Sequence, residues 1–298
     1  MSATQGRPPS DGLAPAKVNL FLHVGPVDAE GYHPLASLAA FADVGDVVTL
    51  QRAAQSSLTV TGPFGAVLVG EGAGACDNLI SRALRALEQV VGADMPPLAV
   101  TLEKRLPIAA GLGGGSSDVG AALKAARDLL ALDLTDAALA EVAATTGADG
   151  AMCLHARTAW AGGRGELLSF EPRLPPLAAL LVNPGAPSPT GAVYHAYDLG
   201  PTAHADRPAP PMAWSAASVI DWLADQRNDL QAPAVALQPA IAEALQAVAA
   251  LPEVRLTRMS GSGATVFGLF DSLAQAKAAG EALAQDRPGW WVAPATLG

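Results

Sequence analysis

Residues 106–118 read Leu-Pro-Ile-Ala-Ala-Gly-Leu-Gly-Gly-Gly-Ser-Ser-Asp, with four glycines within five positions and two serines directly after them. Upstream, residues 98–102 form a short apolar run that predicts a strand. Downstream, apolar side chains recur at helical spacing from Val119 to Leu130, which predicts a helix. The order is therefore a strand, a glycine-rich segment (residues 107–117) and a helix.

This order suits the binding of an anion. Glycine allows the backbone to approach a ligand without a Cβ in the way, and the first N–H groups of a helix lack internal partners and carry positive potential. Phosphate fits both features, and Ser116 and Ser117 could cap the helix, donate to phosphate or hold a magnesium ion. The alternative is an ordinary loop before a helix, which the flanking elements disfavour.

Two better-known glycine motifs are excluded by position. A P-loop requires Lys and then Ser or Thr after its last glycine, but Ser116 occupies the place of that lysine. The dinucleotide fingerprint requires glycine at its sixth place, which is again Ser116 when the count starts at Gly111.

Composition limits the class of protein. The net charge of −10 argues against a nucleic-acid partner, and no apolar run reaches the roughly 20 residues of a membrane helix. Cys76 and Cys153 fit neither a metal site nor a disulfide framework, so we expect two reduced thiols. We predict a cytoplasmic protein without a membrane segment or a metal site of its own, which acts on a small molecule as a monomer or weak homodimer.

The N-terminal segment 14–24 alternates with period two. Lys17, Asn19, Phe21 and His23 share one face of the predicted strand. One interpretation is a half-buried strand with this face in water; the other is that Lys17 and Asn19 point side by side into a site.

Several further segments are turns or short elements. Tyr32 and His33 lie in a predicted turn, where such residues often have no binding role. Residues 58–69 predict a hairpin with glycine turns. Asp149, which precedes an apolar run, could be a simple turn or cap residue. Near the C-terminus, a Ser-Gly-Ser-Gly turn (residues 260–263) joins two predicted strands and could press against a ligand or another loop.

Taken together and in this order, the motifs resemble the GHMP kinase superfamily over nearly the whole chain. The three motifs are Pro15 to Leu20, Pro107 to Ser117 and the turn at 260–263. The resemblance is strongest to a member that phosphorylates an alcohol bearing cytidine diphosphate. The segments that carry it are Pro-Ala-Lys-x-Asn-Leu at 15–20, Gly-Tyr-His at 31–33, Asp-Asn-Leu at 77–79, Gly-Ala-Asp at 147–149 and Asn-Asp-Leu at 228–230.

The resemblance implies a two-domain α+β fold. Residues 1–173 would form an N-terminal α/β domain of the ribosomal-protein-S5 second-domain type, with the ATP loop and the catalytic Lys and Asp. Residues 174–298 would form a ferredoxin-like C-terminal domain, and ATP and the acceptor would meet in the cleft between the two. The Pro-rich segment around Arg173 places the boundary.

The resemblance also implies residue roles. Asp149 would be the general base for the acceptor hydroxyl, and Lys17 would keep Asp149 ionised and stabilise charge at the reaction centre. ATP would come with Mg²⁺ as its co-substrate metal. Asn19, Tyr32, His33 and Tyr194 would bind the cytidine-diphosphate end of the acceptor. The ATP phosphates would be wrapped by Pro107, Ile108, Ala109, Ala110, Gly111, Leu112, Gly113, Gly114, Gly115, Ser116 and Ser117.

One position departs from the family pattern. Gly-Ala-Asp usually continues with Val-Pro, whereas Gly150 and Ala151 follow Asp149 here, which removes the constraint of a proline. Two alternatives to the closest resemblance stay open: a GHMP kinase for another small alcohol, and a non-catalytic nucleotide-binding protein with the same fold.

Overall fold

The computed structural model describes residues 10–70, 78–92, 95–201 and 203–298. The described chain forms two compact units, each discontinuous in sequence, because the long strands β1 (Ser10–Val24) and β2 (Leu35–Arg52) contribute one part to either unit. The boundary predicted near Arg173 divides the chain differently, into the two continuous segments 1–173 and 174–298. Unit 1 takes its residues from 1–15, 45–108 and 114–156, and unit 2 consists of 16–44, 109–113 and 157–298.

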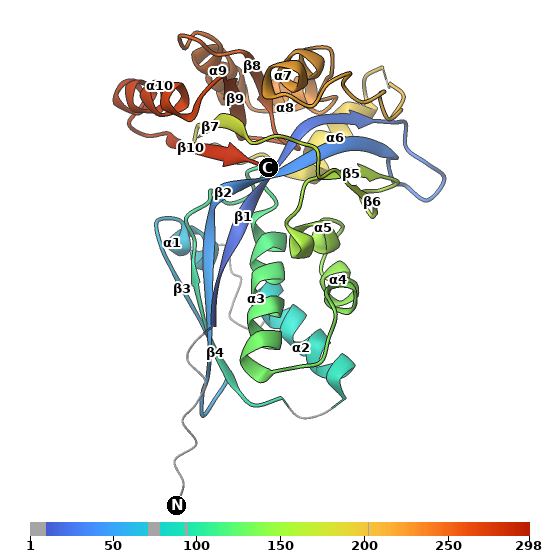
Figure 1. The fold of residues 1–298 in the computed structure, drawn as a ribbon, viewed down its shortest axis with the longest axis vertical. Coiled ribbons are helices and arrows are strands. Elements are labelled where there is room, and N and C mark those ends of the chain that lie inside the picture. Colours follow the sequence, from blue (N-terminus) through green and yellow to red (C-terminus); the bar gives the residue numbers. More distant parts are fainter. Residues whose placement is uncertain (1–9, 71–77, 93–94, 202) are drawn as a thin grey trace, which may run out of the picture. The chain divides into compact units, whose positions relative to one another are not determined.

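Unit 1 packs helices against a small sheet, with α2, α3 and α4 on one side of the strands (Figure 1). Strand β4 (Leu98–Glu103) pairs antiparallel with the second half of β2 and parallel with β3 (Ser57–Thr61). The strand expected at 98–102 and the helix after the glycines are therefore confirmed. The helices of unit 1 are α1 (Gly65–Gly70), α2 (Leu79–Val91), α3 (Gly114–Leu130), α4 (Asp136–Ala144) and α5 (Gly150–His155).

The hairpin predicted for residues 58–69 is wrong. The first strand of that region, β3, finds its partner in the distant β4, and the chain then enters α1 instead of a return strand. Gly62 makes this change of direction with φ +84°, where a Cβ would lie 2.5 Å from the carbonyl oxygen of Lys104. A glycine in a strand-rich sequence thus marks a close backbone approach here.

Two features of the helices in unit 1 follow from local sequence signals: the start of α2 and the buried face of α3. The sequence predicts a helix from about residue 79 to 91 with Asp77 or Asn78 as its cap. The side chain of Asn78 accepts the N–H of Ile80 at 2.9 Å and caps α2, while Asp77 lies outside the described residues. The apolar face predicted for α3 packs into the core, where Val119, Leu123 and Ala126 are fully buried. Periodicity therefore identified the correct helical face.

Unit 2 is built on an antiparallel sheet in the order β2–β10–β7–β9–β8, with β5 pairing both β2 and β6. Leu180 of β7 shows the register of the sheet, because it lies opposite Gly268 of β9 on one side and opposite Pro294 of β10 on the other. The strands are β5 (Ala159–Gly162), β6 (Leu167–Phe170), β7 (Leu177–Asn183), β8 (Leu256–Met259), β9 (Val266–Phe270) and β10 (Trp291–Leu297).

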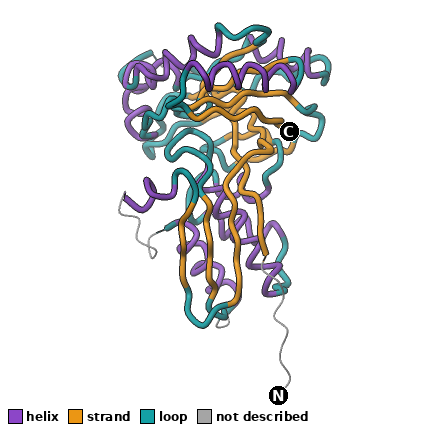
Figure 2. Tube along the Cα trace, turned by 90° about the vertical axis from the view of Figure 1, so that its left-hand side faces the viewer, coloured by secondary structure: helices purple, strands orange, loops and turns teal. Residues whose placement is uncertain are grey.

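Helices α9 and α10 cover one face of this sheet, where β7 and β9 contact both of them (Figure 2). Val182, Ile241 and Phe270 belong to the core between helices and strands. The helices of unit 2 are α6 (Thr190–Asp198), α7 (Ala216–Ala224), α8 (Gln231–Leu237), α9 (Pro239–Ala249) and α10 (Leu273–Asp286).

Cys153 is buried in α5, and Cys76 falls outside the described residues. None of the helices in the described ranges is both long and apolar enough to cross a membrane.

Candidate active site

The β1 face that carries Lys17 and Asn19 is buried. Lys17 is 6% exposed and Asn19 is 5% exposed, so the interpretation of a water-exposed strand face is wrong. The side-chain amide of Asn19 donates to Ser37 Oγ at 2.8 Å, and its backbone N–H donates to Ser260 Oγ at 3.1 Å. Because a buried ammonium or amide is costly unless it has polar partners, this face is built for specific polar contacts.

The C-terminal glycine turn (residues 260–263) lies against the first part of the glycine-rich segment, within unit 2. The hydroxyl of Ser260 donates to the carbonyl of Gly111 at 2.9 Å, and the N–H of Thr265 donates to the carbonyl of Ala110 at 3.1 Å. Two of the three family motifs are thus joined by the bond from Ser260 to Gly111, and the third joins them through the bond from Asn19 to Ser260.

Gly111 is the position of closest approach. It has φ +73°, and a Cβ there would lie 2.3 Å from the carbonyl oxygen of Ser260. We expect Gly111→Ala to lower the free energy of unfolding by about 1–3 kcal/mol, as overpacking does, and to weaken binding of an ATP analogue. Urea unfolding and equilibrium binding would measure both.

The matched control is Gly191→Ala in α6, where a Cβ would meet nothing within 4 Å and φ is not positive. This variant should not be destabilised. A Gly111→Ala protein as stable as the parent would contradict the close approach at this turn.

The Asn-Asp-Leu segment at 228–230 fastens the same region. The amide of Asn228 donates to the carbonyls of Met259 and Gly261 at 2.8 and 2.9 Å. The carboxylate of Asp229 accepts the N–H of Val24 at 2.7 Å. The segment therefore contacts both the end of β1 and the C-terminal glycine turn. These contacts are a structural reason for the Asn-Asp-Leu sequence at 228–230.

In unit 1, helix α3 starts at Gly114, so the last part of the glycine-rich segment forms its first turn. Ser117 is fully buried, and its hydroxyl donates to the carbonyl of Pro15 at 2.7 Å. Ser117 thus anchors the helix to β1, whereas Ser116 is partly exposed in the same turn. Of the two serines, Ser116 is the one whose side chain a ligand could reach.

A buried ionic cluster lies beside this first turn, and the sequence did not predict it. Lys104 donates to Asp46 at 2.5 Å and to Asp118 at 2.9 Å. A Cβ on Gly114 would come within 3.5 Å of the Lys104 ammonium. Asp46 also accepts the N–H groups of Arg105 and Leu106. The only available signal was that Lys104 is one of four lysines in a chain that otherwise uses arginine.

The cluster holds two carboxylates for one ammonium. Burial raises the pKa of Asp118 to about 7, against the lowering effect of Lys104. Burial alone would lower the pKa of Lys104, but Asp118 and Asp46 outweigh it and leave that pKa raised. The Asp118 carboxyl group therefore keeps its proton to a higher pH than an ordinary aspartate does.

The raised pKa predicts a pH dependence of stability. Asp118 holds its proton to about pH 7 in the folded protein but only to its ordinary value of 3.8 when unfolded. Its contribution is therefore complete below pH 3.8 and is lost as the pH rises through about 7. The stability of the parent relative to Asp118→Asn should fall between pH 4 and pH 7, measured by urea unfolding of both proteins. A constant or rising difference would contradict the assigned shift.

Asp149 precedes α5, but its side chain makes no capping hydrogen bond to that helix. Asp149 thus lies in a turn at the N-cap position of α5, and only side-chain capping is absent. Gly150, where the family usually has Val, packs so tightly that a Cβ would lie 2.1 Å from the carbonyl oxygen of Ala143. Close packing against the end of α4 replaces the constraint that a proline would have given.

Within unit 2, the predicted acceptor residues make different contacts. His33 and Tyr194 meet, with ring centroids 5.0 Å apart, and His33 Nδ1 contacts the carbonyl of Gly25 at 2.9 Å. Tyr32 is 53% exposed and lies under the guanidinium of Arg164, which is 3.9 Å from the ring centroid. Arg164 also pairs with Asp28 and Glu30, so the structure adds it to the surroundings of Tyr32.

The fold and these motifs define the class of protein to which the chain belongs. The model of the GHMP kinases N terminal domain matches residues 78–157 and that of the GHMP kinases C terminal matches 213–288. The chain belongs to the GHMP kinase family, whose two-domain α+β fold and ATP-dependent kinase activity were expected from the sequence.

Comparison with individual proteins gives more detail than the family models do. The chain is 56% identical to "4-diphosphocytidyl-2-C-methyl-D-erythritol kinase" of Caulobacter vibrioides, over 94% of this chain and 96% of that one. A crystal structure of 4-(cytidine 5'-diphospho)-2C-methyl-D-erythritol kinase is 34% identical with a TM-score of 0.75, covering 97% and 99% of the two chains. A homoserine kinase from Cytophaga hutchinsonii is 17% identical with a TM-score of 0.66, covering 99% and 97%, and shares the fold.

Proposed function

We propose that this chain uses ATP to phosphorylate the 2-hydroxyl of 4-diphosphocytidyl-2-C-methyl-D-erythritol in non-mevalonate isoprenoid biosynthesis. The observation that carries this proposal is the 56% identity to a kinase of that name over 94% of the chain. The fold by itself would not choose the acceptor, because a homoserine kinase has the same fold.

We propose that the ATP phosphates bind the glycine-rich segment and the first turn of α3. Gly111 and Gly113 take positive φ, a backbone conformation that glycine adopts readily, and the helix N-terminus adds a positive dipole end. Phosphoryl transfer passes through a loose transition state, so oriented N–H groups and positive charge supply much of the catalysis.

We assign Mg²⁺ to the nucleotide. Within the described ranges no three His, Cys, Asp or Glu side chains group in a way that could hold a metal ion. Mg²⁺ usually binds through substrate phosphates and only one or two protein ligands, and the partly exposed Ser116 hydroxyl is the candidate ligand here. When bound, the ion neutralises charge on the phosphates.

The proposed chemical roles follow the residue types. Asp149 would take the proton of the acceptor hydroxyl, because a carboxylate can act as a general base. Lys17 would stabilise negative charge of the reacting groups from its buried place on β1. His33 and Tyr194 would hold the cytidine end together with Asn19 and Tyr32. A buried lysine is a strong local charge because little water screens it.

A coupled assay of ADP release tests the proposed acceptor. The panel contains 4-diphosphocytidyl-2-C-methyl-D-erythritol, mevalonate, homoserine and galactose, and we expect turnover with the first alone. Turnover with another alcohol in its place would favour the alternative of a different acceptor. We also propose a cytoplasmic monomer or weak homodimer that does not bind nucleic acid. The charge of −10 supports the absence of nucleic-acid binding, and gel filtration and nucleic-acid binding test the oligomeric state and this absence.

Tyr32 provides a test of base recognition. Tyr32→Ala should raise the Michaelis constant for the cytidyl acceptor about 5- to 100-fold and leave that for ATP nearly unchanged, because stacking on an aromatic ring contributes about 1–3 kcal/mol per base. Phe170→Ala, which removes another ring with an arginine over it, is the matched control. An effect on ATP instead of the acceptor would reverse the assignment of Tyr32.

A further inference from the structure

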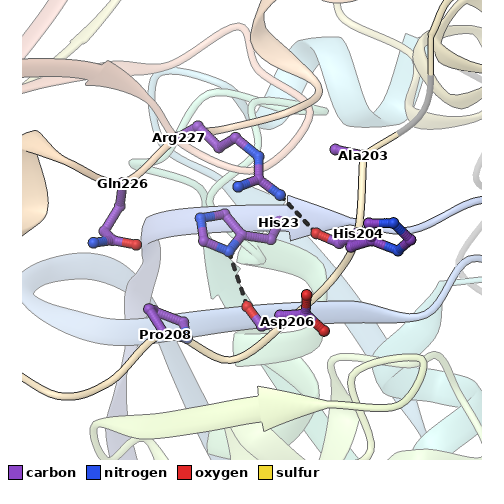
Figure 3. A pocket seen from close by; sticks show the side chains of 7 residues that line it. All are labelled: His23, Ala203, His204, Asp206, Pro208, Gln226 and Arg227. Atoms are coloured by element: carbon purple, nitrogen blue, oxygen red, sulfur yellow. Dashed lines mark hydrogen bonds between the residues drawn. The ribbon is translucent and has the colours of Figure 1, made fainter.

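A pocket of about 630 Å³ lies in unit 2, and none of the residues assigned above to ATP or the acceptor lines it. Its volume falls within the range of roughly 300–1,000 Å³ that is typical of small-molecule sites. Figure 3 shows that β1, the segment 203–208 and the residues before Asn228 contribute its walls. The lining residues are His23, Ala203, His204, Asp206, Pro208, Gln226 and Arg227.

His23 is the buried polar group of this pocket, at 4% exposure. Its Nδ1 lies 3.1 Å from the backbone carbonyl of Asp206. A carbonyl can only accept, so Nδ1 carries the proton and donates, which leaves Nε2 of the neutral ring as an acceptor. Among the described residues, Nε2 has no hydrogen-bond partner, and in Figure 3 it points away from Asp206 towards the side of Gln226 and Arg227.

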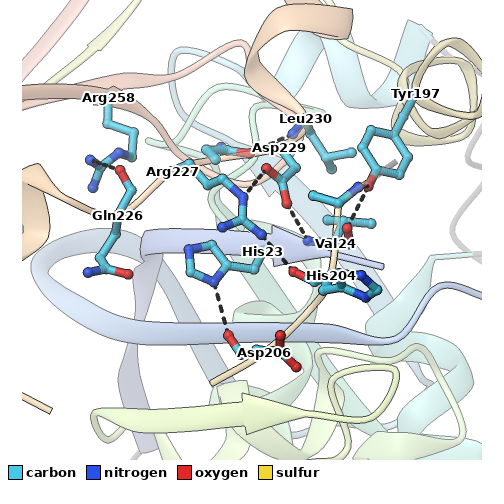
Figure 4. Close-up of polar contacts among 12 residues, drawn as sticks. His23, Val24, Tyr197, His204, Asp206, Gln226, Arg227, Asp229, Leu230 and Arg258 are labelled. Carbon is cyan, nitrogen blue, oxygen red and sulfur yellow. Dashed lines mark hydrogen bonds and ion pairs between the residues drawn. The ribbon is translucent and has the colours of Figure 1, made fainter. Parts of the chain in front are cut away.

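Two neighbouring side chains of the pocket, Gln226 and Arg227, contribute a further hydrogen-bond acceptor and a positive charge. The amide nitrogen of Gln226 donates to the carbonyl of Trp222 at 3.2 Å, so its amide oxygen is the atom left to accept. Arg227 donates through Nε to Asp229 and through Nη2 to the carbonyl of His204 (Figure 4). The pocket therefore presents the acceptors of His23 and Gln226 beside a guanidinium that its partners hold in place.

The charges around His23 determine which kind of hydrogen-bond donor can bind to its Nε2. Burial lowers the pKa of His23 below its ordinary 6.5, and Arg227 and Arg258 lower it further, against the raising effects of the Asp206 carbonyl and Asp229. The ring is thus neutral at physiological pH. Two arginines near the ring disfavour a cation at Nε2, and an anion without hydrogen cannot donate to it.

We propose that this pocket binds a small uncharged molecule with several hydroxyl groups, of the class of polyols and sugars. A hydroxyl group donates and accepts at once, so one hydroxyl satisfies His23 Nε2, a second satisfies the amide oxygen of Gln226, and their oxygens accept from Arg227. The carbon chain packs on Pro208 and Ala203. Buried polar atoms in proteins nearly always have a partner, and this ligand supplies the one for Nε2.

The test uses the full chain with ¹⁵N-labelled histidine. Erythritol is the probe, and 1,2-dimethoxyethane, which has similar size but no donor, is its control. We expect a saturable shift of the His23 Nε2 resonance with erythritol alone. The resonance is identified among the five histidines by its loss in His23→Asn. A shift that is linear in concentration, or equal for the two probes, would overturn the proposal.

His23→Asn is also the informative variant for affinity. The asparagine amide keeps a donor near the Asp206 carbonyl but has no acceptor at the place of Nε2. It should weaken erythritol binding about tenfold in ligand-observed NMR, while His195→Asn, an exposed histidine on α6, should not. If His23→Asn binds erythritol as the parent does, the probe binds elsewhere, for example at the acceptor site, and the proposal fails. Kinase activity is assayed separately and does not enter this result.

Discussion

Asp149→Asn is expected to reduce turnover about 10²–10⁴-fold, the usual cost of removing a general base. The loss should fall in the lower part of that range, because a loose transition state takes the proton from its nucleophile late. Binding of ATP and of the acceptor should change little, since the substitution keeps the shape of the side chain. Single-turnover phosphoryl transfer, with separate equilibrium binding of each substrate, measures the two effects.

The structure makes this test a clean one. The Asp149 side chain makes no capping hydrogen bond to α5, and thermal unfolding of the parent and the variant checks that both are folded in the assay. Asp136→Asn is the control, because Asp136 is an exposed aspartate at the start of another helix, α4, where it pairs with Arg127. That control should keep full turnover. A fully active Asp149→Asn enzyme would show that the carboxylate is not the base.

Lys104→Met is expected to lower the free energy of unfolding by about 3–5 kcal/mol, as removal of one partner from a buried ion pair does. The reason is Asp46, which is 0% exposed and would keep a charge without its ammonium. Exposed Lys277 on α10 provides the control, since Lys277→Met should stay within about 0.5 kcal/mol. Urea unfolding at pH 7 measures all variants.

A second substitution separates charge from packing. In Lys104→Met with Asp46→Asn, the asparagine oxygen can still accept the N–H groups of Arg105 and Leu106, but no unpaired charge remains. The double variant should therefore be more stable than Lys104→Met alone. If the second substitution instead destabilises further, the methylene chain of Lys104 and not its charge is what matters.

Local sequence signals determined much of this fold. The glycine-rich segment, with a strand before it and a helical apolar face after it, predicted β4 and α3 correctly. Asn78 was correctly placed as a cap, because capping depends on atoms two residues apart. The motif order was enough to predict the GHMP kinase family and an ATP-dependent kinase, which the matches to the chain confirm. The individual site residues stay predictions.

Properties that depend on distant partners could not be predicted in this way. Period two in β1 placed Lys17, Asn19, Phe21 and His23 on one face, but only the packing of other elements over that face showed that it is buried. The hairpin at 58–69 failed because β3 pairs with a strand about forty residues away.

The charged cluster of Lys104, Asp46 and Asp118 shows the same limit in chemistry. Its members are 14 and 58 residues apart along the chain, and none of them has a local pattern that marks it. Likewise, the acceptor at His23 Nε2 follows only from the carbonyl of Asp206, which is 183 residues away and fixes the tautomer. The sequence by itself determined the local elements, their order and the family, since these rest on short-range backbone preferences and motif spacing. Tertiary structure decided which polar groups are buried and what they face, because burial and pairing arise only when distant segments exclude water from each other.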